Sequence, residues 1–220
     1  MNDNQQNITE EIKYHDLFPT PVLSTMIPES FSKSMDNLFS LELMGKEDGI
    51  EEEAYGKRTI NSYILHLPEF KELSDYILKC AVDFGKNYGL PYNDFKFSQS
   101  WLSVKTPGQS HTIHTHPNSL ISGVFYFGPS NQKTSAIHFH PFLSPGNGPS
   151  INMNQQINTS KYCSSHIGFD FIPGQLLLFP SSLQHSVPVN DTDLPRYSLA
   201  FNIVPTYGLG EEASLTELKF

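Results

Sequence analysis

The pattern of hydrophobic and polar positions divides the chain into a helical first part and a strand-rich second part. Between residues 68 and 88, apolar residues recur every three or four positions, and Pro68 with Glu69 suits a first helical turn. The apolar stripe consists of Phe70, Leu73, Ile77, Leu78, Ala81 and Phe84. We expect an amphipathic helix here, packed on the core. A weaker pattern predicts another helix over residues 30–44.

After residue 92, short runs rich in Phe, Tyr, Val and Ile alternate with loops that contain Pro and Gly. The predicted strands cover residues 95–105, 120–127, 136–140, 169–172, 175–179, 185–189 and 197–204. Residues 17–23, interrupted by two prolines, predict an edge strand before the helices. Short strands at this spacing favour a mainly β fold with flanking N-terminal helices, a jelly roll or barrel, over a parallel α/β sheet.

The length of 220 residues suits one domain with its own core. We expect residues 1–13 to be loosely ordered because they are polar. Residues 14–91 then contribute the first strand and the buttressing helices, and residues 92–207 form the β core. Residues 144–166 predict a long loop, either a lid or a surface excursion.

Charge and composition exclude several classes of partner. The net charge is -9 and no cluster of Lys and Arg occurs, which argues against nucleic acids and anionic membranes. No apolar run has the length of a signal peptide core or of a membrane span, so we expect a soluble, cytoplasmic protein. Cys80 and Cys163 lie in no metal-binding spacing and predict free thiols. For the oligomeric state, a homodimer is the default expectation.

Seven of the nine histidines lie between His111 and His185, where the only carboxylate belongs to Asp170. Residues at i and i+2 project from the same face of a strand, so His114 and His116 can converge on one ion, and His185 can complete the set. Imidazole nitrogens suit Fe, Zn, Cu or Ni. The sequence therefore predicts a metal site of these three histidines. A set that uses His111 with His114 is disfavoured, because i and i+3 do not share a strand face.

A second His-x-His pair, His138 and His140, is more readily explained as structural or exposed than as a second metal site. Asp170 becomes a ligand only if its strand crosses the site. Trp101 and Phe97 share strand parity with polar neighbours, a face that can line a substrate pocket. Core packing is the favoured interpretation of a lone Trp, and the substrate pocket is the alternative.

Alternation along residues 196–203 places polar and small residues on one face and large apolar residues on the other. An arginine on such a face ordinarily contacts solvent. If the face instead lines the barrel interior, the guanidinium of Arg196 is a fixed fork suited to grip a carboxylate with two hydrogen bonds.

Residues 114–126, His-Thr-His-Pro-Asn-Ser-Leu-Ile-Ser-Gly-Val-Phe-Tyr, resemble the signature of a small group of Fe(II)/2-oxoglutarate-dependent oxygenases. The resemblance runs from about Trp101 to Asn202. It implies a double-stranded β-helix, the cupin-like jelly roll, with helices on one side. It also implies Fe(II), 2-oxoglutarate as cosubstrate and O2, in an enzyme that hydroxylates an unidentified substrate.

The resemblance also implies roles for particular residues. His114 is similar to the first metal ligand of the family, and His185 to the distal histidine. Four residues resemble those that hold the far carboxylate of 2-oxoglutarate, namely Arg196, Ser198, Tyr126 and Ser122.

The chain departs from the superfamily at His116, where most members have Asp or Glu. A three-histidine set leaves one more positive charge than a set with a carboxylate. Two alternatives therefore stay open. One is a cupin-like three-histidine metalloenzyme that does not use 2-oxoglutarate, and the other is a non-catalytic β-sandwich binding protein.

Overall fold

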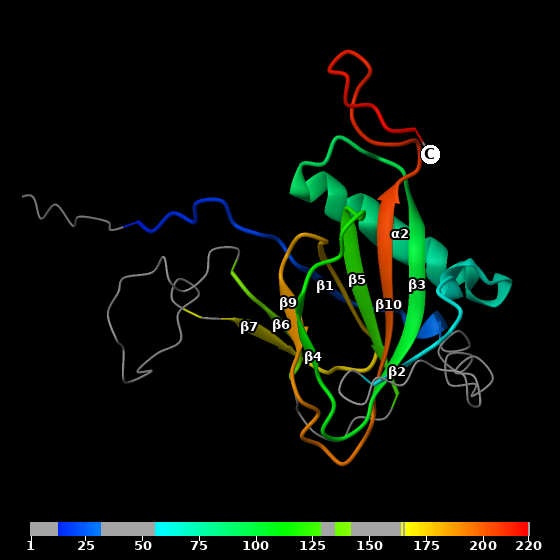
Figure 1. Ribbon diagram of the computed structural model, residues 1–220, viewed down its shortest axis with the longest axis vertical. Helices are drawn as coiled ribbons and strands as arrows, with labels where there is room; N and C mark the ends of the chain where they lie inside the picture. Colours follow the sequence, from blue (N-terminus) through cyan, green and yellow to red (C-terminus); the bar gives the residue numbers. More distant parts are fainter. Residues whose placement is uncertain (1–12, 32–55, 129–134, 142–163, 165, 220) are drawn as a thin grey trace, which may run out of the picture.

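The computed structural model describes residues 13–31, 56–128, 135–141, 164 and 166–219. In these residues two antiparallel sheets face each other, and one long helix lies beside the larger sheet (Figure 1). The larger sheet has the strand order β1-β8-β5-β10-β3-β2, and the smaller has the order β4-β9-β6-β7.

The strands of the larger sheet are β1 (Leu23–Met26), β2 (Lys57–Arg58), β3 (Phe95–Lys105), β5 (Ile121–Phe127), β8 (Gln175–Pro180) and β10 (Arg196–Pro205). Those of the smaller sheet are β4 (His111–His114), β6 (Ser135–Phe139), β7 (Ile167–Asp170) and β9 (His185–Val187). Short 3-10 turns cover Glu29–Phe31, Ile64–His66 and Pro68–Phe70.

Helix α2 (Lys71–Tyr88) forms where the apolar stripe predicts it, and the turn at Pro68–Phe70 leads into it. The helix ends at Gly89, whose φ of 80° lies in the left-handed region that favours glycine. Its buried side chains, among them Leu73 and Ile77, join one core cluster with Leu199 and Phe201 of β10. The helix therefore covers the outer face of the larger sheet.

A second core lies between the two sheets. Val124 and Tyr126 of β5 contribute to it with Phe179 of β8, and Ile137 and Phe139 of β6 face them from the smaller sheet. Because side chains alternate along a strand, the intervening residues of β5 pack on the helix side instead. The larger sheet is thus buried on both faces, and its inner face is available to line a site.

Gly123 marks a close approach within the larger sheet. A Cβ atom placed there would lie 2.4 Å from the ring of Phe201 and 2.7 Å from the side chain of Leu178. No such contact is tolerated by real side chains, so the ring of Phe201 occupies the space that only a glycine leaves open. This gives a packing reason for the Gly in the Ser-Gly-Val sequence.

The structure corrects some expected boundaries. The first strand begins at Leu23, after the two prolines, and lies at the sheet edge beside β8, as proline permits. The strand expected over 169–172 is Ile167–Asp170, and the one expected over 185–189 ends at Val187, before Pro188. Among the described residues Cys80 is a free thiol.

Several expectations fall outside the described residues. These are most of the helix expected over 30–44, nearly all of the loosely ordered segment 1–13, nearly all of the loop 144–166, and Cys163. In the described part of the chain, no helix has the length and apolar character needed to cross a membrane.

The expectation that Phe97 and Trp101 lie on the same face of the strand is wrong. Opposite β10, residue Asn202 pairs with Gln99 and Ile203 pairs with Phe97, so Ser98 is an extra residue in β3. A one-residue irregularity moves all later side chains to the other face. Phe97 consequently lies in the core beside Phe201, and Trp101 lies on the inner face.

Candidate metal centre

The pairing of β4 with β9 brings two of the predicted ligands together. His114 and His185 are Cα partners in this antiparallel pair. Directly opposed side chains have Cβ atoms about 4.5–5.5 Å apart. The two imidazole centroids accordingly lie 4.2 Å apart.

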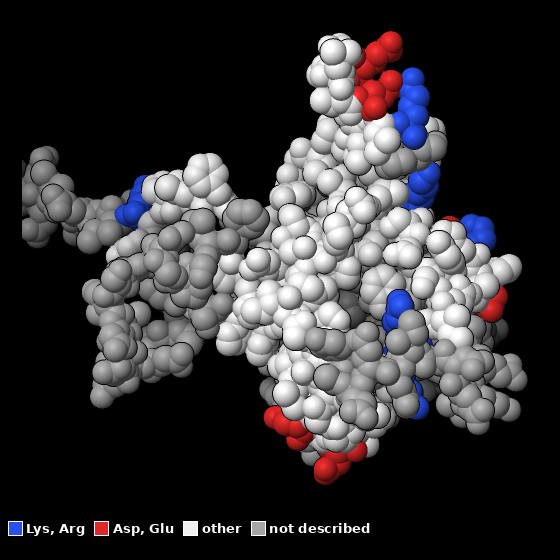
Figure 2. Space-filling model, in the orientation of Figure 1, with Lys and Arg blue, Asp and Glu red and all other residues white. Residues whose placement is uncertain are grey.

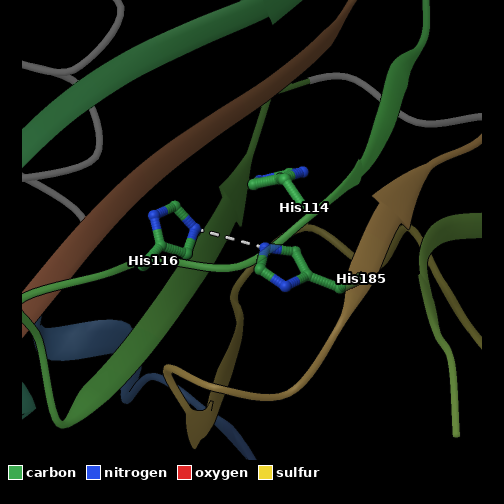
Figure 3. A group of neighbouring side chains, drawn as sticks. All are labelled: His114, His116 and His185. Carbon is green, nitrogen blue, oxygen red and sulfur yellow. Dashed lines mark hydrogen bonds between the residues drawn. The ribbon is translucent and has the colours of Figure 1, made fainter. Parts of the chain in front are cut away.

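His116 reaches the same point from outside the strand. β4 ends at His114, so the expectation that both residues belong to one strand is wrong. The backbone N–H of His116 donates to Ser181 O at 3.0 Å, and the chain then turns through Asn118, whose φ is 60°. Asn tolerates this left-handed conformation better than most residues. His116 Nε2 lies 3.2 Å from His185 Nε2, and both atoms point toward each other (Figure 3).

The ligand nitrogens of His114, His116 and His185 all lie within 4.8 Å of one another. In the described part of the chain, this is the one group of three or more His, Cys, Asp or Glu side chains that could hold a metal ion. Asp170 and the pair His138 and His140 do not belong to it.

The distances and tautomers fit a metal ion. With metal–nitrogen bonds of about 2.0–2.1 Å, two adjacent ligands of one ion lie about 3 Å apart, close to the separation of the His116 and His185 nitrogens. His185 Nδ1–H donates to Leu183 O at 2.9 Å, which leaves the lone pair on Nε2. His114 Nδ1–H donates to Thr112 O at 2.8 Å in the same way. Such partners typically fix the tautomer and orientation of metal ligands.

The protonation states fit as well. Burial lowers the pKa of His185 to about 3 and that of His116 to about 4, and it also lowers the pKa of His114. All three imidazoles are therefore neutral at pH 7, with lone pairs available. Neutral imidazole suits Fe(II) and other first-row metals. The donor set thus fits the iron that the resemblance implies.

His111 joins this cluster, although the strand spacing argues against it. The register of β4 shifts between His111 and His114, and this irregularity brings the two onto one face. Their Nδ1 atoms lie 2.9 Å apart and their ring centroids 4.1 Å apart. Periodicity along β4 alone gives no signal for this contact, because the irregularity depends on pairing with β9.

A cavity of about 120 Å³ continues from the cluster into the space between the sheets. It is lined by all three predicted ligands and by Arg196, Ser198, Tyr126 and Trp101. Ser198 and Tyr126 are Cα partners on β10 and β5. The polar face of β10 therefore lines the space between the sheets. In this arrangement the guanidinium of Arg196 can bind a carboxylate in the cavity.

Arg196 is held in place at this cavity. Its side chain is only 5% exposed, and Nη2 donates to Pro188 O at 2.5 Å. Burial raises the pKa of Tyr126, and the nearby charge of Arg196 acts in the opposite direction. The phenol therefore keeps its proton at pH 7 and can donate to an anionic oxygen.

Ser122 is not among the described residues that line the cavity. Its hydroxyl donates to Asn202 Oδ1 and lies within hydrogen-bond distance of Ser181 Oγ, both at 2.8 Å. It shares the face of Tyr126 but lies four residues back along β5. The structure thus engages Ser122 in a buried polar network rather than beside Arg196.

Residues 99–202 match the family model described as "Putative 2OG-Fe(II) oxygenase". Over this stretch, somewhat less than half of its length, the chain is similar to the 2OG-Fe(II) oxygenases. This confirms the family that the resemblance suggests, and with it the expectation of an enzyme, an oxidoreductase. No curated protein matches the chain by sequence.

Several solved structures have a similar fold. A prolyl-4-hydroxylase from Pseudomonas putida is 12% identical with a TM-score of 0.57, over 84% of this chain and 93% of that chain. The epimerase SnoN from nogalamycin biosynthesis, in complex with Fe3+ and alpha ketoglutarate, is 11% identical with a TM-score of 0.59, over 90% of this chain and 86% of that chain.

HygX from Streptomyces hygroscopicus, with nickel, 2-oxoglutarate and hygromycin B bound, is 16% identical with a TM-score of 0.56, over 91% of this chain and 92% of that chain. At these identities the similarity concerns the fold. It confirms the mainly β double-stranded β-helix predicted from the sequence.

Proposed function

We propose that this oxygenase is a dioxygenase in which His114, His116 and His185 hold Fe(II) and 2-oxoglutarate occupies the cavity behind them. The observation that carries the proposal is the convergence of three neutral imidazoles at the mouth of a cavity that contains a buried arginine. When bound, Fe(II) couples the oxidation of 2-oxoglutarate by O2, with release of succinate and CO2, to hydroxylation of a substrate C–H bond.

The residues of the chain position the reactants. The three imidazoles fix the ion against the edge of the smaller sheet, and the carbonyls of Leu183 and Thr112 hold two of the rings in the required tautomer. Arg196 offers a guanidinium fork to the far carboxylate of 2-oxoglutarate. Tyr126 and Ser198 add hydroxyl donors beside it, on the strands that flank the cavity.

The ligand set has an electrostatic consequence. Three neutral imidazoles leave the full charge of the ion, whereas a set with one carboxylate offsets part of it. A dianionic cosubstrate beside the ion is then more strongly attracted, because charges interact strongly in a buried, poorly solvated site. We therefore expect 2-oxoglutarate to bind far better to the Fe(II)-loaded protein than to the metal-free protein.

Anaerobic titration of the protein with Fe(II) and then with 2-oxoglutarate tests the proposal. We expect one Fe(II) per chain, followed by a weak visible charge-transfer band that saturates with 2-oxoglutarate. Stoichiometric Fe(II) binding without any 2-oxoglutarate binding would favour the three-histidine metalloenzyme that does not use this cosubstrate. Failure to bind Fe(II) would remove the metal centre itself.

A further inference from the structure

A second, larger cavity also adjoins the histidine cluster. This outer cleft has a volume of about 470 Å³, within the range typical of small-molecule sites, whereas the inner cavity measures about 120 Å³. The two share the side chains of Trp101, Ser103, Lys105, His111, His114 and His116. A molecule in the outer cleft can therefore contact three of the four histidines that line the inner cavity.

The outer cleft is lined by cations. Lys57 and Arg58 come from β2, and Lys105 comes from the end of β3. No Asp or Glu occurs among the described residues that line it. This contrasts with the chain as a whole, whose net charge is -9. In Figure 2 acidic side chains gather at the top and bottom of the face, whereas basic side chains are scattered, with one group near the middle.

Arginine is scarce in this chain. The sequence contains only two arginines, Arg58 and Arg196. Arg196 lines the inner cavity, and Arg58 lines the outer cleft. A guanidinium is a planar fork that matches the geometry of carboxylates and phosphates, unlike a lysine ammonium. Each cavity therefore has one group of the kind that grips an oxyanion.

The backbone that carries Arg58 and Lys57 is fixed against β3. Arg58 pairs with Ser103 and Lys57 with Val104. The next residue, Thr59, donates its N–H to Leu102 O at 3.0 Å and accepts from Leu102 N at 3.2 Å through Oγ1. These bonds hold the two cations at the cleft before any ligand arrives.

Gly56 tightens this attachment. Its φ is +82°, and a Cβ atom there would lie 2.4 Å from Val104 O. Glycine is thus required where β2 meets the sheet. The position of Arg58 at the cleft follows from a close backbone contact rather than from a flexible surface segment.

We propose that the outer cleft binds a small substrate through an anionic group, a phosphate or a carboxylate, which Arg58 and Lys57 hold. The remainder of the substrate then extends along Trp101 toward the histidine cluster, where the indole lies 6.0 Å from the ring of His116. The identification of this ligand as the substrate rests on the proposed function. The anion site itself rests on the cleft and its charges.

Trp101 provides the test, because it is the only tryptophan of the chain and lines the cleft. Metal-free protein is titrated with glycerol 3-phosphate, glycerate and glycerol while tryptophan fluorescence is recorded. We expect a saturable change with at least one of the two anions and none with glycerol. Which anion binds more tightly distinguishes phosphate from carboxylate. The affinity should fall as salt is added, since the contacts at the cleft are partly solvent-exposed.

Arg58→Gln locates the site. We expect it to weaken anion binding about tenfold or more, whereas Lys79→Gln, which removes a charge from the exposed face of α2, should leave binding unchanged. An anion response that survives Arg58→Gln but disappears in Arg196→Lys would place binding in the inner cavity and overturn the proposal. So would an equal response to glycerol. Thermal unfolding followed by circular dichroism verifies that each variant is folded.

The outcome is independent of the metal titration. Anion binding that depends on Arg58, in a protein that fails to bind Fe(II) and 2-oxoglutarate, would retain the cleft and overturn the proposed function. Stoichiometric binding of Fe(II) and 2-oxoglutarate without an anion response that depends on Arg58 would retain the proposed function and overturn the anion site in the outer cleft.

Discussion

His185 is the most deeply buried of the three proposed ligands, with 4% of its surface exposed. It is neutral at pH 7, its Nδ1–H is engaged with Leu183 O, and its Nε2 points toward His116. With the proton on Nδ1, the lone pair of Nε2 can bind a metal ion or, in the metal-free protein, accept a hydrogen bond from His116. The ring also packs against Phe139 and Phe179, so its orientation is supported by the core between the sheets.

We predict that His185→Ala or His114→Ala abolishes stoichiometric Fe(II) binding while the fold survives, because each removes a ligand from a site that the sheet supports. Anaerobic equilibrium dialysis with Fe(II) measures the effect. His66→Ala is the matched control, since His66 is exposed and lies outside the cluster. Full metal affinity in the His185 variant would rule out the assignment.

His116 is the residue at which the chain departs from the usual ligand set. A carboxylate at this position would lower the net charge of the loaded site by one. If His116 coordinates, His116→Asp should retain Fe(II) binding, since a carboxylate is the third ligand in the 2-His-1-carboxylate sites of many non-haem Fe(II) oxygenases. Retained binding with altered 2-oxoglutarate affinity is the expected result in the same dialysis and titration. Complete loss of Fe(II) binding would argue that this position cannot host a carboxylate ligand.

We propose that Arg196 binds the cosubstrate and does not contact the metal. Arg196→Lys keeps the charge and loses the fork. An imperfectly replaced charged hydrogen bond costs roughly 1.5–3 kcal/mol, so the affinity for 2-oxoglutarate should fall about tenfold or more. Fe(II) affinity should stay nearly constant, and Ser198→Ala should have a smaller effect. Calorimetric titration of the anaerobic Fe(II) protein compares the three proteins, and unchanged 2-oxoglutarate binding in the lysine variant would remove Arg196 from the cosubstrate site.

At the scale of elements, the packing of the larger sheet requires a glycine at position 123. Gly123→Ala would force its methyl group into the ring of Phe201 and the side chain of Leu178, both fully or almost fully buried. Overpacking of this kind typically costs about 1–3 kcal/mol. Urea unfolding should show that loss in the free energy of unfolding, whereas Gly108→Ala should show only the strain of its positive φ, because nothing lies within 4 Å of it. Equal stability of the Gly123 variant and the wild type would mean that Phe201 can move aside.

The sequence predicts elements well where periodicity is local. The alternation along β10 identifies its two faces, and the stripe along α2 identifies the side that packs on the core. Prediction from the sequence fails where a strand has an irregular register with its distant partner. The extra Ser98 in β3 separates Phe97 from Trp101, and the irregular register of β4 unites His111 with His114. Such irregularities depend on partners that alternation within one strand does not reveal.

The candidate site shows the same limit. The sequence could predict that His114, His116, His185 and Arg196 gather at one site, because spacing and resemblance identify them one residue at a time. The outer cleft could not be predicted, because Lys57 and Arg58 form a strand of two residues with no periodic pattern of its own. Only the pairing of β2 with β3 brings these cations to the histidine cluster, across more than forty positions of sequence.

At the scale of the whole molecule, charge is distributed unevenly. The chain carries an excess of acidic residues, yet among the described residues that line the two cavities there are four Lys or Arg side chains and no Asp or Glu. The net negative charge of the chain disfavours binding of long polyanions, whereas the basic side chains that line the two cavities suit small anions. Such a distribution favours small anionic ligands over both long polyanions and uncharged molecules.

The neutral imidazoles make the stability of the metal-free molecule dependent on pH. In the folded protein burial lowers the pKa values of His111 and His116 to about 4 and that of His185 to about 3, against 6.5 in the unfolded chain. Between these values the unfolded chain binds protons that the folded chain does not. The free energy of unfolding therefore falls as the pH drops from about 7 toward 4.

We predict that the melting temperature of metal-free protein falls over this range, and that His116→Gln makes the fall shallower because it removes one group that takes up a proton on unfolding. Circular dichroism melts of the wild type and the variant at several pH values measure the two melting temperatures. Because both proteins contain the same carboxylates, which also titrate below pH 5, the difference between the two curves reports on His116. Bound Fe(II) should raise the melting temperature at pH 7, since a ligand that binds only the folded state stabilises it, and this gain should shrink in acid as protons compete for the same nitrogens. Parallel curves for wild type and His116→Gln would show that this imidazole is not kept neutral by the fold.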